Sequence, residues 1–239
     1  MTELRQIAYE ADGREMVGTL AIPDGTDQRP GVLLAHEGPG IGDNTRDFAR
    51  RLADAGYVAF ALDYHGGGTP IADRTEMMER LVELIGDVDR TRSLARAGLS
   101  VMLAQDRVDH DRIAAIGFCF GGTMALELAR DGADVKGVVG FHSGLGTPRP
   151  EDASNIAGKV LVCIGTEDPI IPPEQRTAFE AEMRAAGVDW RMNLYGGAAH
   201  SFTNPEARRS GIPGIEYHEP TAARSWRAMI DLFDEVFPA

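Results

Sequence analysis

The feature that most constrains this chain is a glycine-rich segment around Cys119, which joins a run of strand type to a run of helix type. Residues 113–118 are apolar, whereas residues 120–129 are rich in helix formers, so the hydrophobic period changes at Cys119. Glycine removes side chains where a tight turn forces backbone segments together, and three glycines flank this cysteine: Gly117, Gly121 and Gly122. The segment predicts a strand that turns sharply into a helix, with Cys119 exposed at the corner.

This spacing is that of a nucleophile elbow, G-x-Nu-x-G, with a thiol in place of the usual hydroxyl. The sulfur of Cys119 would lie at the N-terminus of the following helix, where the partial positive charge favours a thiolate. The alternative is a buried cysteine in a glycine-rich turn, since cysteine is often simply a small core residue. We interpret Cys119 as a candidate nucleophile.

Apolar strand-type runs alternate with helical segments along most of the chain, after an initial hairpin formed by residues 4–8 and 16–22. This alternation predicts an α/β fold in one domain spanning residues 1–239, with a mostly parallel central sheet and helices on both faces. In such sheets the chemistry lies in loops beyond the carboxyl ends of the strands. The predicted strands after the hairpin are 31–36, 57–64, 113–118, 137–141, 160–165 and 189–195, and the predicted helices include 44–56, 74–85, 88–105, 173–186 and 221–237.

Charge and composition limit the partners of the chain. The net charge is −13 and no Lys/Arg cluster offers a track for phosphates, which argues against nucleic acid as a partner. The first residues lack the apolar core of a signal peptide, and no apolar run has the length of a membrane span. Two cysteines, Cys119 and Cys163, are too few for a disulfide framework. We expect a cytoplasmic protein with a small-molecule substrate; the sequence does not fix its oligomeric state.

A cysteine nucleophile needs a base, and the base needs a partner that holds its tautomer. For an elbow on a doubly wound sheet the expected order is nucleophile, acid, histidine, each in a loop after a strand. Asp168 follows the strand predicted at 160–165, and Pro169 biases it away from helix. A turn or capping role is the alternative for Asp168, and Glu167 is the competing carboxylate.

His200 is the candidate base, because it follows the strand predicted at 189–195 in a loop of small residues. The other histidines do not have the position that the chain order requires. His36 and His142 lie at strand ends near the same sheet edge. His65 lies in a loop, His110 before a strand and His218 near the last helix. We therefore predict a triad of Cys119, Asp168 and His200.

Attack on a carbonyl leaves an oxyanion that needs preorganised donors. We expect one from the backbone N–H of Phe120, directly after the nucleophile, and a second from the loop after the strand predicted at 31–36, at Gly38. Glu37 is unusual here, because a carboxylate beside an oxyanion hole opposes the developing charge. Either it points away as a structural acceptor, or it contacts the thiol or the substrate before reaction; the spacing does not choose.

With these residues in view, the chain resembles the dienelactone hydrolase family of α/β-hydrolases. The resemblance covers most of the chain and rests on five motifs: residues 36–40 (HEGPG), 62–64 (LDY), 117–122 (GFCFGG), 165–169 (GTEDP) and 200–202 (HSF). It implies that Cys119 is the nucleophile, His200 the base and Asp168 the group that orients the base. It also implies that the carboxylate at Glu37 controls the thiol by taking its proton when substrate arrives. No metal or organic cofactor is implied.

The substrate contacts depart from the family pattern. Dienelactone-cleaving members hold the substrate carboxylate with arginines, one of them shortly after the catalytic histidine, whereas here residues 203–205 are Thr-Asn-Pro and the next arginine is Arg208. Arg74 and Arg80 are candidates for the other. The resulting hypothesis is an ester or lactone hydrolase that forms an acyl-enzyme intermediate.

Two alternatives remain open. The first is a carboxylesterase or thioesterase for neutral small esters, and the second, from another class, is a thiol-based redox sensor or ligand carrier. A metal site at His36, Glu37 and His65 is disfavoured, because their spacing matches no standard site. The irregular stretch 203–220 is a candidate lid or subunit contact.

Overall fold

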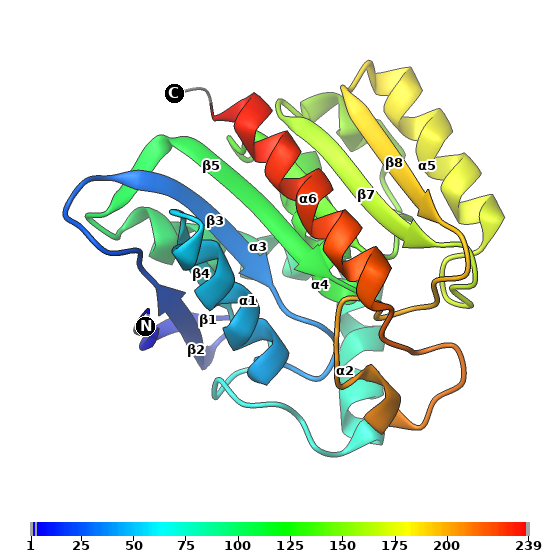
Figure 1. The fold of residues 1–239 in the computed structure, drawn as a ribbon, viewed down its shortest axis with the longest axis horizontal. Coiled ribbons are helices and arrows are strands. Elements are labelled where there is room, and N and C mark those ends of the chain that lie inside the picture. Colours follow the sequence, from blue (N-terminus) through cyan, green and yellow to red (C-terminus); the bar gives the residue numbers. More distant parts are fainter. Residues whose placement is uncertain (1, 3, 238–239) are drawn as a thin grey trace.

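An eight-stranded sheet runs through the molecule in the order β1-β2-β4-β3-β5-β6-β7-β8 (Figure 1). The computed structural model describes residue 2 and residues 4–237. β1 pairs antiparallel with β2 and β2 with β4, and every other pair is parallel. The mostly parallel sheet after an initial hairpin is thus confirmed. The strands are β1 (Leu4–Ala11), β2 (Arg14–Ala21), β3 (Arg29–Ala35), β4 (Val58–Leu62), β5 (Val108–Phe118), β6 (Gly137–Phe141), β7 (Lys159–Gly165) and β8 (Trp190–Tyr195).

Helices cover both faces of the sheet. One face packs against α1 and α6, which cross in front of the strands in Figure 1, and the other packs against α2, α3, α4 and α5. Alternate residues of β3 enter the two cores, Leu34 on one side and Leu33 on the other, which is why its sequence is apolar throughout. The helices are α1 (Asp43–Asp54), α2 (Arg74–Gly86), α3 (Val88–Leu103), α4 (Phe120–Arg130), α5 (Pro173–Ala186) and α6 (Glu219–Val236), with short 3₁₀ turns η1 (Pro150–Asn155) and η2 (Ala207–Ser210).

Several element boundaries differ from the predicted ones. β5 begins at Val108 rather than at residue 113. β4 ends at Leu62, because the Asp63 carboxylate accepts hydrogen bonds from the backbone N–H groups of the next turn and bends the chain there. α1 spans Asp43–Asp54 instead of the predicted 44–56; its N-terminal cap is Gly42, in extended conformation, and Asn44 lies inside the helix.

The carboxyl ends of the parallel strands bring the loops of interest to one edge of the sheet. In sheet order these are the loops after β4, β3, β5, β6, β7 and β8, and β5, which leads into the Cys119 turn, lies between β3 and β6. No helix within residues 2 and 4–237 has the length and hydropathy to cross a membrane.

Candidate active site

The Cys119 turn has the strained geometry that its glycines predict. Cys119 precedes the first residue of α4 with φ 53° and ψ −123°, a conformation that is rare for a residue with a side chain. A Cβ at Gly117 would lie 2.1 Å from the Gly121 carbonyl oxygen, and one at Gly121 would lie 2.3 Å from the Ala35 carbonyl oxygen. Any larger side chain at either position would therefore open the turn. Cys119 itself is partly exposed.

The two predicted partners on the later loops meet directly. Nδ1 of His200 lies 2.8 Å from Oδ2 of Asp168, and both side chains are buried. The other carboxylate oxygen of Asp168 accepts the backbone N–H groups of Ile170 and Ile171 at 2.8 and 3.3 Å. The bonded carboxylate and the imidazole thus hold each other in one orientation, with Nδ1 as the protonated nitrogen. The competing Glu167 contacts only the neighbouring Thr166 hydroxyl through its side chain, among the hydrogen bonds of the described residues.

Two features set the position of the His200 loop: the absence of a side chain at Gly165, and hydrogen bonds to the segment that follows η2. A Cβ at Gly165 would lie 2.1 Å from the Ala198 carbonyl oxygen, so the loop passes directly over the end of β7. The backbone of His200 also bonds to the stretch that follows η2, donating to Gly214 and accepting from Glu216, both at 2.9 Å. The irregular segment 203–220, predicted as a candidate lid, therefore holds the backbone of His200 in place through these two hydrogen bonds.

Cys119 acts electrostatically on His200. Burial alone would lower the pKa of this imidazole, but the neighbouring Cys119 sulfur and the bonded Asp168 carboxylate outweigh burial and raise the pKa of His200 to about 10. Nε2 of His200 is buried and makes no hydrogen bond to the described residues in this conformation. The site thus brings the three predicted residues together and favours a protonated imidazole next to the thiol.

Glu37 lies at this site and is held by a residue that the sequence did not single out. Its Oε2 accepts a hydrogen bond from Nδ2 of Asn204 at 2.8 Å, and its Oε1 is buried without a partner among the described residues. Burial raises the pKa of the Glu37 carboxyl, although the Asn204 amide and the charge of His200 act to lower it. Asn204 follows His200 by four positions, and only that spacing could have marked it.

His142 is a second residue whose role the sequence did not reveal. Its ring lies edge-on to that of His200 at 4.9 Å between centroids. Nε2 is 2.9 Å from the hydroxyl of Thr203 and 3.9 Å from Oε1 of Glu37. Burial, reinforced by the charge of His200, lowers the pKa of His142 well below its ordinary value. His142 is therefore neutral, whereas the neighbouring His200 favours the protonated form.

The predicted oxyanion donors lie at the start of α4 and in the loop after β3. Phe120 is the first residue of α4, so its N–H is one of the amides that a helix leaves without an internal partner. Gly38 is buried under α2, where a Cβ would lie 3.0 Å from a methyl of Leu81. The N–H of Gly38 donates to no acceptor among the described residues.

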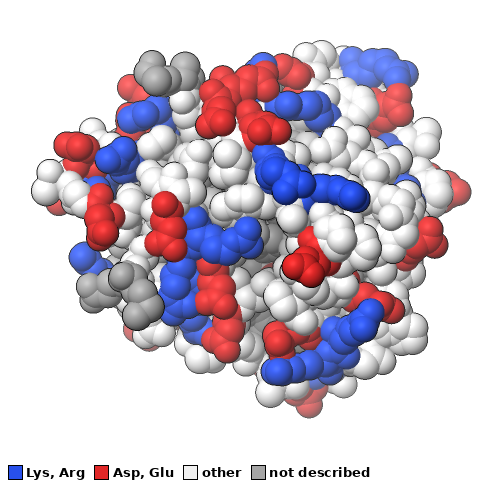
Figure 2. All heavy atoms as spheres, in the orientation of Figure 1, with Lys and Arg blue, Asp and Glu red and all other residues white. Residues whose placement is uncertain are grey.

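Of the three candidate arginines, two have other partners and the third is exposed. Arg80 donates to the His65 carbonyl oxygen at 2.8 Å and pairs with Glu76. Arg208 is on the exposed surface, paired with Glu216 at 3.0 Å, and the Arg74 side chain is exposed at the start of α2. On the face in Figure 2, Lys and Arg are interspersed with Asp and Glu rather than gathered into one patch.

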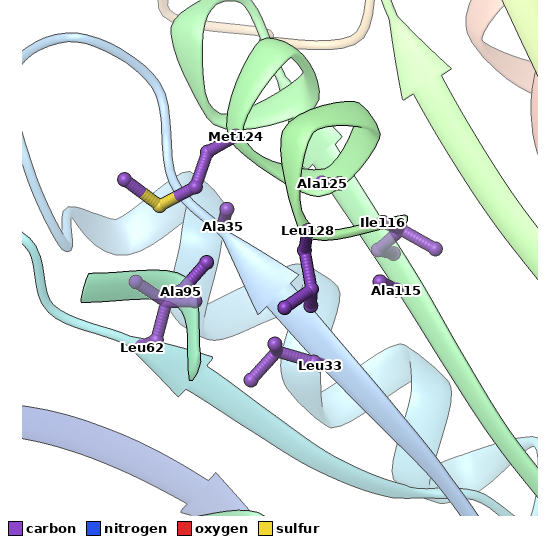
Figure 3. Close-up of a pocket in the computed structure, with 9 residues that line it drawn as sticks. All are labelled: Leu33, Ala35, Leu62, Ala95, Ala115, Ile116, Met124, Ala125 and Leu128. Carbon is purple, nitrogen blue, oxygen red and sulfur yellow. The ribbon is translucent and has the colours of Figure 1, made fainter. Parts of the chain in front are cut away.

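Two cavities lie near the elbow. One is a gap in the core between the sheet and α4, shown in Figure 3; its lining is wholly apolar and leaves no room for a water molecule, so it is a packing defect. The other is an open pocket between α2, α3 and α4. It is lined mainly by apolar side chains and includes Phe120 and Thr123, which follow Cys119 on α4.

Comparisons with known proteins agree on one family. The model of the "Dienelactone hydrolase family" matches residues 16–237. A protein of Yersinia pestis named "Putative carboxymethylenebutenolidase" is 28% identical over 94% of this chain and 85% of its own length. The structure named "m3DLH" is 48% identical over 99% of both chains with a TM-score of 0.95.

The second solved structure adds a further activity among the relatives. The crystal structure of "Dienelactone Hydrolase-like Promiscuous Phospotriesterase P91 from Metagenomic Libraries" is 39% identical over 98% of both chains with a TM-score of 0.94. The sheet, the elbow and these matches lead to one conclusion: the chain belongs to the dienelactone hydrolase family and has the α/β-hydrolase fold.

Proposed function

We propose that this hydrolase cleaves the ester or lactone bond of a small molecule by nucleophilic attack of the Cys119 thiolate. The observation that carries the proposal is the imidazole of His200, which is hydrogen-bonded to Asp168 and whose pKa is raised to about 10 next to the sulfur. An imidazolium beside a thiol stabilises the thiolate, and the thiolate is the reactive form.

The reaction then follows in two halves. The thiolate forms a bond to the carbonyl carbon, and the carbonyl electron pair moves to oxygen, where the N–H groups of Phe120 and Gly38 receive it. Collapse expels the alkoxide, which takes the proton from His200 and leaves a thioester on Cys119. Neutral His200 next removes a proton from water, the hydroxide attacks the thioester, and the thiolate departs. In a lactone the alcohol formed in the first half remains part of the product.

Glu37 enters the proposal as the proton acceptor of the resting thiol. Burial raises the pKa of Tyr64 most, and charge on Cys119 and charge on Glu37 raise it further, which supports a position of the two groups around one ring. A carboxyl whose pKa is raised by burial keeps a proton at a higher pH than an exposed carboxyl does. Glu37 would then store the proton of Cys119 while the thiolate reacts.

The surroundings of Glu37 favour a neutral substrate. The residue bonded to this carboxyl is the neutral amide of Asn204, and the guanidinium of Arg80 is taken up by a carbonyl and by Glu76. An anionic substrate would thus enter without a free cation from these positions. The pocket beside Phe120 and Thr123 is mainly apolar, so we propose that it takes an uncharged acyl or alcohol group.

The nucleophile is tested with two cysteine variants. Cys119→Ala should lower kcat/KM for p-nitrophenyl esters by at least about 10³-fold, since removing a nucleophile disables the whole triad. Cys163→Ala is the matched control, because burial raises the pKa of that thiol to about 12 and the residue lies in the core. Acid-quenched wild-type protein should carry the mass of one acyl group at Cys119.

Two outcomes would contradict the mechanism. Full ester turnover by Cys119→Ala would exclude the thiolate as nucleophile. Stoichiometric oxidation of Cys119 by peroxide, with no turnover of any ester or lactone, would instead favour the redox sensor.

Substrate charge is tested by comparing kcat/KM for matched esters with neutral and carboxylate-bearing acyl groups. We expect the neutral ester to be preferred at least about tenfold, and Asn204→Arg to reduce that preference by supplying a cation. Neutral phosphotriesters belong in the same screen, because the P91 structure is 39% identical to this chain. A clear preference of the wild-type enzyme for the anionic ester would overturn the neutral-substrate assignment.

A further inference from the structure

The peptide group between Glu37 and Gly38 is held by an unusual number of donors. The carbonyl oxygen of Glu37 lies 2.6 Å from Nδ1 of His36, 3.0 Å from the hydroxyl of Tyr64 and 3.1 Å from the N–H of Gly40. The Tyr64 hydroxyl is also 3.0 Å from the His36 carbonyl oxygen, so its single proton is shared between neighbouring carbonyls. The direction of this peptide plane is therefore strongly fixed.

Fixing the carbonyl of Glu37 also fixes the N–H of Gly38, because both belong to one planar unit. In a trans peptide the C=O and the N–H point in opposite directions, and this peptide is trans. Donors that hold the oxygen on one side therefore aim the N–H to the other. That N–H meets no acceptor within the described chain, so it is available to an incoming oxygen.

The following peptide group is held by a second histidine. Nε2 of His65 lies 2.7 Å from the carbonyl oxygen of Gly38. His65 is fixed in turn, since its own N–H donates to Asp63 and its carbonyl accepts from Arg80. The next residue is Pro39, which has no N–H. The loop thus presents the Gly38 amide between two carbonyl groups that are held by hydrogen bonds.

The side chains of this network are uncharged donors. Burial, together with the nearby His65, lowers the pKa of His36 to about 3, and burial also lowers the pKa of His65. Burial raises the pKa of Tyr64 well above its ordinary value. Each ring therefore keeps the N–H or O–H that faces its carbonyl across the working pH range.

We infer that His36, Tyr64 and His65 are positioning residues that orient the Gly38 N–H toward the transition-state oxyanion. They do not touch the substrate; they act through the Glu37–Gly38–Pro39 backbone. The inference rests on the proposed function, in which Gly38 supplies an oxyanion donor. It predicts that the three side chains affect binding of the tetrahedral state more than binding of the substrate.

The test compares two kinds of inhibitor on matched variants. A trifluoromethyl ketone analogue of the ester accepts the thiolate at its carbonyl carbon, and the electron pair moves to oxygen, so it reports on oxyanion binding. The corresponding alcohol has no electrophilic carbon and reports on ground-state binding. The ratio of the two inhibition constants does not depend on how much of a sample is folded.

Asn and Leu at position 36 separate shape from donor capacity, because the two side chains are similar in size but only Asn can donate. We expect His36→Leu and Tyr64→Phe each to lower kcat about tenfold or more with KM changed less than about twofold, a part of the 10²–10³ that a whole oxyanion donor supplies. The ketone-to-alcohol ratio should weaken by the same factor. His36→Asn should recover most of the lost kcat and most of the ketone-to-alcohol ratio.

Tyr9→Phe is the control for loss of a buried tyrosine hydroxyl. That hydroxyl bonds to the backbone of Asp63 at 2.7 and 3.0 Å, next to Tyr64, but does not touch the Glu37 carbonyl. The Tyr9→Phe variant should have a lower melting temperature, but its ketone-to-alcohol ratio of inhibition constants should stay within about twofold of wild type.

The two levels of the hypothesis fail in different ways. If His36→Leu and Tyr64→Phe leave the ratio unchanged while Cys119→Ala abolishes tight ketone binding, the orienting role is wrong and the cysteine mechanism stands. If the ketone binds Cys119→Ala as tightly as wild type, the proposed function itself is wrong.

Discussion

The Cys119 elbow lies between two groups of loops, and each contains a nearly fully buried histidine. On the side of β7 and β8, the pKa of His200 is raised to about 10. On the side of β3 and β4, the pKa of His36 is lowered to about 3. His200 meets the Asp168 carboxylate and the Cys119 sulfur, whereas the bond of His36 is to a carbonyl oxygen and its ring stacks on Tyr64 at 3.7 Å.

The difference shows how one residue type serves two purposes. Burial by itself makes an imidazole neutral, since it removes the water that stabilises the cation. An adjacent anionic group reverses this and produces a base that can carry a proton. Without such a group the imidazole remains a fixed donor, suited to holding backbone geometry. His142 extends the comparison: its Nε2 contacts the Thr203 hydroxyl rather than bonding to a carboxylate, the charge of His200 adds to the effect of burial, and the ring is neutral as well.

Removing the negative charge of Asp168 should have the largest effect, because it is the carboxylate that distinguishes the surroundings of His200 from those of His36. Asp168→Asn keeps the shape of the side chain but removes the charge that holds Nδ1–H of His200, so we expect kcat/KM to fall about 10³–10⁴-fold. Steady-state kinetics on an activated ester measures this. Glu167→Gln, at the exposed neighbouring carboxylate, should change kcat/KM less than about twofold. If the two variants lose equal activity, Asp168 does not have the assigned role.

The charge of His200 should also appear in the pH dependence of stability. Its folded pKa, about 10, lies above the ordinary value of 6.5. The stabilisation is therefore fully present below pH 6.5 and is lost as the pH rises toward 10. The melting temperature of wild type should fall over this interval by several degrees more than that of Cys119→Ala, which lacks the sulfur that raises this pKa most. Parallel melting curves would contradict this interpretation.

His142 should affect stability but not proton transfer. His142→Asn removes a buried ring and its contact with Thr203, and should cost about 2 kcal/mol in the free energy of unfolding. The pH profile of kcat/KM should keep its inflection points, because His142 is neutral throughout. Urea denaturation and pH–rate profiles provide the two readouts. A shifted inflection would instead place His142 in the proton pathway.

The smallest expected effect is at Glu37. Burial raises the pKa of Glu37 in the folded protein above the ordinary 4.5, so wild type loses stability as the pH rises above that value. A Gln side chain at this position cannot ionise and can still accept the hydrogen bond from Asn204. Glu37→Gln should melt about 2–4 °C higher than wild type at pH 8, the shift that about 1 kcal/mol produces in a domain of this size. At pH 4 the two should coincide. An exposed control, Glu79→Gln, should show no pH-dependent difference.

Most of the fold was predictable because its signals are local. Apolar runs, helical spacing and turn residues indicated the hairpin, the parallel strands and the five helices named from the sequence, with errors mainly at the ends. Those errors have a physical cause: β4 ends early because the Asp63 side chain captures backbone N–H groups, and α1 starts at a glycine in extended conformation. Neither effect has a periodic signature in the sequence.

The sequence by itself determined the elbow and the order of Cys119, Asp168 and His200, because steric exclusion at three glycines and the succession of strands are written along the chain. Only the tertiary structure decided what surrounds them. The bond between Asn204 and Glu37 joins residues 167 positions apart, and the donors on the Glu37 carbonyl come from two different strand ends. Such contacts depend on how loops from separate strands meet at one sheet edge. All of these histidines are buried there, so the anionic groups beside each ring, rather than residue type, set which histidine is charged.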